Sequence, residues 1–171
     1  FQTEGSNSYS SQAGTRVIRF KLATEGWMDP STARFFFDLV NNDPDGGAKH
    51  ARPLCAAHAF FRRLRITMRG VVIEDIADYN RVHEMFNILQ TKGARENDRA
   101  ESFGYNAGIE ELNTPALLPG ITSFQTVCFQ PLCGPLMQSK YIPLRYCPIE
   151  IELELADVSE PIVFGSHGAF T

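Results

Sequence analysis

Apolar and polar side chains alternate over several short stretches of the chain, which is the pattern of strands that bury one face. The stretches span residues 16–22, 34–40, 62–69, 123–130 and 149–156, with a shorter apolar stretch at 162–164. In the stretch 149–156, Ile and Leu alternate with Glu side chains. After residue 69, Gly70 can adopt the positive φ of a tight turn, and residues 71–73 supply β-branched side chains, which predicts a hairpin.

Helical spacing replaces this alternation at about residues 78–91. Apolar side chains recur there every three or four positions, at Tyr79, Val82, Phe86 and Leu89. The carboxylate of Asp75 or Asp78 is expected to cap the start of this helix. Gly93, which follows Lys92, is expected to end it.

The order of these elements predicts an all-β fold, an antiparallel β-sandwich with one inserted helix. Several short strands in succession, long loops and the lack of a strand–helix–strand repeat favour this class. Residues 54–61 are expected to form one helical turn. Residues 1–14 are polar and rich in Ser and Gly, so we expect a flexible arm before a folded domain at 15–171. The side chains expected in the core are Ile18, Phe20, Phe37, Leu64, Ile66, Val127, Ile151 and Leu153.

The composition restricts the classes of partner. With 171 residues, 43% of them hydrophobic, the chain is long enough for one domain with a sizeable core. The net charge of −4 argues against a protein that binds nucleic acid by neutralising its phosphates. Residues 112–139 are uncharged, but four prolines interrupt them, so no membrane span is predicted.

Residues that bind metals or catalyse reactions do not form a recognisable set in the sequence. The loop at 41–52 begins like a calcium-binding EF-hand loop, but its twelfth position is Arg52 instead of Glu, so a plain turn is favoured. His83 and Glu84 lack the second His of a zinc-binding helix. Because no nucleophile–base pair is visible either, the sequence predicts no enzymatic activity, no metal and no cofactor.

The four cysteines, Cys55, Cys128, Cys133 and Cys147, include no CxxC pair. Two disulfides in an extracellular fold remain open as an alternative. Free buried thiols in a protein made inside a cell are the favoured interpretation.

Two of the predicted strands carry rows of like charge on one face. The basic row is Arg63, Arg65 and Arg69, and the acidic row is Glu150, Glu152 and Glu154. The basic row has no interleaved aromatic side chains, so a salt-bridging or subunit-contact face is favoured over an RNA site. Three acids in a row more often face solvent or a basic partner than act as catalytic carboxylates. We therefore treat these six side chains as candidate interface residues.

Two longer stretches resemble a known family. They are RRLRITMRGVVIEDIADYNRVHEMF, which starts at Arg62, and KYIPLRYCPIEIELELAD, which starts at Lys140. Together they are similar to the first jelly roll of the major capsid proteins of the double jelly-roll lineage of eukaryotic DNA viruses, especially polinton-like viruses and virophages. The opening WMDPSTARFFFDLVNND also fits this family, and the resemblance covers roughly residues 15–156. The residues that carry it are Gly70, Val72, Glu74, Asp75, Ile76, Tyr79, Asn80, Arg81, Tyr141, Pro143, Leu144 and Arg145.

The resemblance implies a jelly-roll β-sandwich that serves as a viral capsid structural protein. The expected assembly is a trimeric, pseudo-hexagonal capsomer of an icosahedral shell. Its partners would be a homotrimer, neighbouring capsomers and a minor capsid (penton) protein, and its location would be the virion, after synthesis inside the host cell. Because the chain has the length of about one roll, we expect the first of two rolls of a longer protein.

Jelly-roll strand order carries an expectation about the charged rows. It places the strand at 62–69 in one sheet and the strand at 149–156 in the other. The two rows are then not expected to neutralise each other within one domain. We expect at least one row to meet a complementary surface on the second roll or on an adjacent subunit.

Two alternatives come from other classes of protein. A single jelly-roll carbohydrate-binding module would carry exposed Trp and Tyr side chains on a concave face, whereas Trp27 is expected in a turn and the tyrosines are scattered along the sequence. Single-roll capsids of RNA viruses often have an Arg-rich arm, whereas residues 1–14 contain neither Lys nor Arg. The capsid protein of the double-roll type is the preferred hypothesis.

Overall fold

The computed structural model describes residues 1–5, 8–11, 15–41, 56–91, 93, 124–157 and 160–161. The strands of these segments are β1 (Val17–Leu22), β2 (Trp27–Met28), β3 (Phe35–Val40), β4 (Phe61–Met68), β5 (Val71–Ala77), β6 (Phe124–Phe129), β7 (Ile142–Pro143) and β8 (Ile149–Leu155). The helices are α1 (Tyr79–Ile88) and α3 (Gly134–Met137), and two 3₁₀ turns are η1 (Pro30–Thr32) and η2 (Ala57–Phe60). The predicted strand at 162–164 and the calcium-like loop beyond Asn41 lie outside the described residues.

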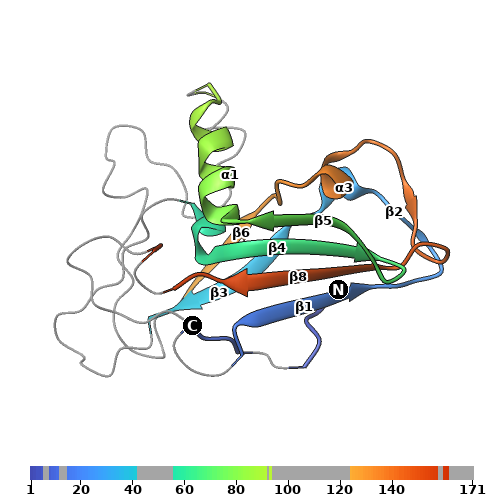
Figure 1. The fold of residues 1–171 in the computed structure, drawn as a ribbon, viewed down its shortest axis with the longest axis horizontal. Coiled ribbons are helices and arrows are strands. Elements are labelled where there is room, and N and C mark those ends of the chain that lie inside the picture. The colour runs from blue at the N-terminus through green and yellow to red at the C-terminus, as the bar shows by residue number, and fades with distance from the viewer. Residues whose placement is uncertain are drawn as a thin grey trace.

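All strand pairs are antiparallel, and the pairs are nested along the chain. Strand β1 pairs with β8, β2 with β7, β3 with β6 and β4 with β5. Strand β4 also pairs with β8, so the largest sheet has the order β1-β8-β4-β5, beside the two-stranded sheets β2-β7 and β3-β6 (Figure 1). The prediction of a mostly β fold with antiparallel sheets and little helix is confirmed.

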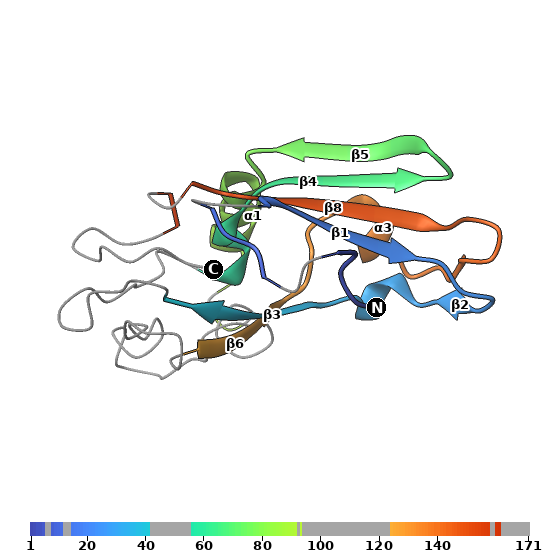
Figure 2. The ribbon, with the colours of Figure 1, turned by 90° about the horizontal axis from the view of Figure 1, so that it is seen from below.

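The core lies between the four-stranded sheet and the β3-β6 pair, which form two layers in Figure 2. Phe37 of β3 packs edge-on against Phe61 of β4, with 5.3 Å between the ring centroids. Leu64, Ile66 and Leu153 lie on the inner face of the larger sheet and are buried. All eight predicted core side chains belong to this cluster, with Ile18, Phe20 and Phe37 only half-buried at its border.

The β4–β5 hairpin has a two-residue turn at Arg69 and Gly70, whose φ angles are 50° and 79°. Two positive φ values are the requirement of a type I′ turn, which matches the right-handed twist of the strands. Strand β4 therefore ends at Met68, one residue before the predicted end. A register shift at Ile66/Thr67 places a bulge in this hairpin.

Helix α1 is shorter than the predicted helix at 78–91, and its apolar stripe is only partly buried. Tyr79 is fully buried, whereas Phe86 and Leu89 are 47% and 76% exposed. Asp78 occupies the position before the helix with a φ of 50°, but its side chain makes no capping hydrogen bond. The predicted carboxylate cap is therefore wrong. The helix is instead attached through its first residue, since the Tyr79 hydroxyl accepts a hydrogen bond of 2.8 Å from the Leu132 N–H.

The described part of residues 1–14 contacts the sheet at its β1 edge. Thr3 forms a bridge with Phe20, and the Glu4 N–H donates a hydrogen bond of 2.8 Å to the Arg19 carbonyl. Cys128, Cys133 and Cys147 form no disulfide among the described residues, and Cys55 lies outside them. No helix in the described segments is long and apolar enough to cross a membrane.

Candidate functional site

The outer face of the four-stranded sheet collects most of the predicted interface residues. In β8, Ile149, Ile151 and Leu153 are buried because the inner face packs on the core. The alternation of a strand then directs the acidic row to the opposite face. Glu150 is exposed there, and Glu152 and Glu154 are partly covered by neighbouring side chains.

The basic row lies on the strand directly beside the acidic row. In the β4–β8 register Arg63 faces Glu154 and Arg65 faces Glu152. The expectation that the two rows occupy different sheets is therefore wrong. The physical reason is that the last strand, β8, inserts between β1 and β4. Its acidic side chains are therefore only one strand away from the basic side chains of β4.

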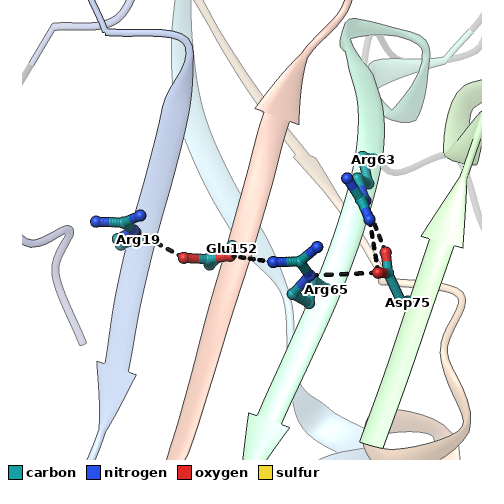
Figure 3. A network of polar contacts seen from close by, with 5 residues as sticks. All are labelled: Arg19, Arg63, Arg65, Asp75 and Glu152. Carbon is teal, nitrogen blue, oxygen red and sulfur yellow. Dashed lines mark hydrogen bonds and ion pairs between the residues drawn. The ribbon is translucent and has the colours of Figure 1, made fainter. Parts of the chain in front are cut away.

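A chain of ion pairs crosses the sheet on this face (Figure 3). The Arg19 Nε of β1 lies 2.8 Å from Glu152 Oε1, and Glu152 Oε2 lies 3.6 Å from Arg65 Nη1. The Arg65 Nε lies 3.3 Å from Asp75 Oδ2 of β5. Arg63 completes the chain with two hydrogen bonds of 2.7 Å from Nε and Nη2 to the two Asp75 oxygens.

Among these ion pairs across the sheet, the Arg63–Asp75 pair has the strongest electrostatic coupling. The hydrogen bond from Arg63 lowers the pKa of the Asp75 carboxyl, and the same bond raises the pKa of the Arg63 guanidinium. Both side chains remain open to solvent, at 41% exposure for Arg63 and 31% for Asp75. Water and salt therefore screen the pair, and its geometry orients the side chains more than it stabilises the fold.

The sign of the charge alternates from strand to strand on this face. Strand β1 is basic, β8 acidic, β4 basic and β5 acidic. We call these eight side chains the striped face: Arg19, Lys21, Glu150, Glu152, Glu154, Arg63, Arg65 and Asp75. The striped face carries as many cations as anions, so it is neutral as a whole, while each strand contributes charges of one sign.

One predicted interface residue lies elsewhere, and two residues of the ion-pair series were not predicted. Arg69 occupies the hairpin turn, where its N–H lies 3.4 Å from the Pro148 carbonyl, so it is not part of the basic row. Arg19 and Asp75 were missed, and Asp75 was interpreted as a helix cap. Alternation along β1 and β5 places both on an outer face, but only the strand order reveals that they flank the two rows.

The predicted helix residues His83 and Glu84 belong to a partly buried polar cluster between η2 and α1. The His58 Nε2 lies 3.0 Å from Glu84 Oε2, and His58 stacks on His83 with 4.0 Å between the ring centroids. A cavity of about 40 Å³ adjoins the two rings. Among the described residues, no three His, Cys, Asp or Glu side chains are placed to hold a metal ion. The His58–Glu84 contact attaches α1 to η2, the turn before β4.

A larger cleft of about 650 Å³ opens between the two layers on the β1 side. Aromatic rings dominate its lining, among them Phe20, Phe35 and Phe37, and residues 1–3 border it. In the described part of the chain this cleft provides apolar surface but no acid–base pair.

Exposed aromatic side chains surround the small β2-β7 ribbon. Trp27 pairs with Pro143 and is 69% exposed, and Tyr141 and Tyr146 are 65% and 68% exposed. The Arg145 guanidinium lies 5.7 Å from the centre of the Tyr146 ring. The expectation of Trp27 in a turn is wrong, because Trp27 lies in strand β2 and pairs with β7, which follows Tyr141 directly in the sequence.

Comparisons with known proteins add no relative. No family model, curated protein or solved structure matches the chain.

Proposed function

We propose that the chain is a structural subunit of a viral capsid, a jelly-roll domain that assembles into trimeric, pseudo-hexagonal capsomers of an icosahedral shell. The observation that carries the proposal is the nested strand pairing, in which the first half of the strands runs antiparallel to the second half. A jelly roll is an eight-stranded, two-sheet fold whose strand pairs are nested in the same way. The sheet order of this chain departs from that fold in one respect, because β8 pairs with β4 in the larger sheet.

The positions of the residues that carry the family resemblance support the proposal. Gly70 forms the hairpin turn, and Tyr79 anchors the start of α1. The stretch from Tyr141 to Arg145 contains β7 and leads into β8. These residues therefore lie in the turn and the connections that border the strands of the four-stranded sheet. Such positions are where we expect a family to keep residues with a structural role.

The partners proposed with this function are two further copies in a trimer, neighbouring capsomers and a minor capsid (penton) protein, all within a virion. In this view the chain is one roll, and a second roll completes the capsomer outline.

Electron microscopy of the purified full-length product tests this function. Hexagon-outlined trimers or closed particles are the expected result. A monodisperse preparation without either at high protein concentration would contradict the capsid function.

One observation favours a second candidate, a carbohydrate-binding module. Exposed Trp and Tyr rings can stack on the apolar faces of sugar rings, and Trp27, Tyr141 and Tyr146 gather at the β2-β7 ribbon. Titration of the protein with soluble oligosaccharides, followed by Trp fluorescence, separates the two candidates. Saturable quenching of Trp27 fluorescence that disappears in Tyr141→Ala but persists in Phe36→Ala, an exposed ring on β3, would favour the module.

A further inference from the structure

We propose that the striped face binds the striped face of a second copy of this chain, face to face, around a two-fold axis that runs parallel to the strands between β8 and β4. The proposal starts from one row of side chains across the sheet. Arg19, Glu152, Arg65 and Asp75 are successive register partners on β1, β8, β4 and β5. Read across the sheet, their charges are positive, negative, positive and negative.

A row with an even number of alternating charges reads in the opposite order after a rotation by 180°. Each charge of the rotated row then faces an opposite charge of the original row. A two-fold axis parallel to the strands reverses the strand order but keeps the level along the strands. Glu152 then faces Arg65 of the second copy, and Arg19 faces Asp75 of the second copy. Every charge of this row thus meets an opposite charge.

The neighbouring rows obey the same rule. In the next row along the strands, Glu154 and Arg63 are register partners in the centre of the sheet. Glu154 of one copy therefore faces Arg63 of the other copy across the axis. At the next level Lys21 faces the apolar Val72, and Glu150 faces Thr67. No like charges meet in any of the three rows of this face.

The alternative two-fold axis is rejected by the same charges. An axis that runs across the strands places β8 opposite β8 and β4 opposite β4. Acidic side chains would then face acidic ones, and like charges that face each other across an interface suppress such pairings. The pattern therefore selects one docking geometry, in which two twisted sheets cross at roughly 30°.

The size of the face determines how strong the contact is. Four strands about 4.8 Å apart and about six residues long cover roughly 400 Å² per copy. The total of about 800 Å² is below the 1,200–2,000 Å² of stable complexes. Isolated copies are therefore expected to associate weakly, and the contact gains strength where many copies are held together. In this respect the proposed pairing rests on the capsid function.

Charge reversal in two separate variants tests the pairing. In Glu152→Arg and in Arg65→Glu, the two-fold axis creates two like-charge contacts, so self-association measured by sedimentation at low ionic strength should weaken at least about tenfold. An equimolar mixture of the two variants restores opposite charges at both contacts, so it should associate as the parent does. A network that acts only within one chain does not give this rescue.

Two further variants control for damage to the fold. The double variant Arg65→Glu with Glu152→Arg breaks the alternation within the chain but keeps opposite charges across the axis, so it should still self-associate. Glu25→Arg is the same kind of reversal away from the striped face, on a side chain that is 84% exposed, and it should leave association unchanged. Circular dichroism verifies that each variant is folded.

Several outcomes would overturn the pairing: a parent that stays monomeric at low salt, single variants that associate as the parent does, or a mixture that sediments as its separate components. The pairing and the capsid function fail in different ways. Particles that form regardless of these charges would overturn the pairing and leave the function standing. Pairs that form in solution and depend on these charges, without any capsomers, would overturn the capsid function and leave the pairing standing.

Discussion

At the scale of single residues, Asp75 shows how one carboxylate organises a surface. It accepts two hydrogen bonds of 2.7 Å from Arg63 and one of 3.3 Å from Arg65. These bonds lower the pKa of the Asp75 carboxyl. A carboxyl whose pKa is lower in the folded state stabilises the fold above its unfolded pKa, and this contribution is lost as the pH falls through the folded pKa.

Asp75→Asn should therefore lower the melting temperature slightly at neutral pH. The difference from the parent should begin to shrink as the pH falls below about 4, the pKa of an Asp in an unfolded chain, and should be lost once the pH passes the lower pKa of Asp75 in the folded state. The difference should also shrink in high salt. Melting curves over a pH series measure this. Glu25→Gln is the control, because the Glu25 side chain is 84% exposed and lies away from this face. A difference that grows on acidification would contradict the assigned role of Asp75.

Leu153 is a residue-scale test of the strand faces. Its side chain is 1% exposed in the centre of the core, so Leu153→Ala should lower the free energy of unfolding by about 2–5 kcal/mol. Leu89→Ala, at a side chain that is 76% exposed, should change it little. Chemical denaturation compares the two variants, and equal effects would mean that the faces of β8 are assigned wrongly.

At the scale of elements, the β4–β5 hairpin depends on two residues with positive φ. Arg69 has a φ of 50°, a conformation that costs an ordinary L-residue roughly 1–2 kcal/mol and that Asn tolerates better. Arg69→Asn should therefore stabilise the protein by about 0.5–1 kcal/mol, whereas Gly70→Ala should destabilise it by about 1 kcal/mol. Chemical denaturation measures both changes, and a destabilising Arg69→Asn together with a neutral or stabilising Gly70→Ala would contradict the assigned turn.

The attachment of α1 gives a second prediction at this scale. The Tyr79 hydroxyl accepts the Leu132 N–H in a buried position. Tyr79→Phe leaves that donor without its acceptor and should cost about 1–3 kcal/mol of unfolding free energy. Tyr146→Phe, at an exposed ring, is the control and should be close to neutral. A neutral effect of Tyr79→Phe would show that another group accepts this N–H.

Alternation along the chain was sufficient to predict which strand residues are buried. Leu153 and Glu152 could be assigned to opposite faces because a strand has a fixed period of two. The sequence was not sufficient to predict which strands are neighbours. Arg19 and Glu152 are 133 positions apart, and their contact depends on β8 inserting between β1 and β4. The predicted apolar stripe of the helix was wrong at Leu89, which is exposed. Helical spacing alone does not determine whether another part of the protein covers that end of the helix.

At the scale of the whole molecule, the nested strand pairs and the striped face support one account. The nested pairs form a two-layer β fold whose larger sheet has an apolar inner face and a charged outer face. The ion pairs keep the outer side chains in an ordered pattern without making the face apolar. Such a face suits weak contacts repeated in a large assembly better than one tight complex.

Cryo-electron microscopy of the purified full-length product tests the central claim, a capsid building block, most directly. The account predicts hexagon-outlined trimers or shells in which the density of each roll fits the sheet order β1-β8-β4-β5. A protein that remains a dispersed monomer at every concentration and ionic strength, with no ordered assembly in the images, would contradict the account.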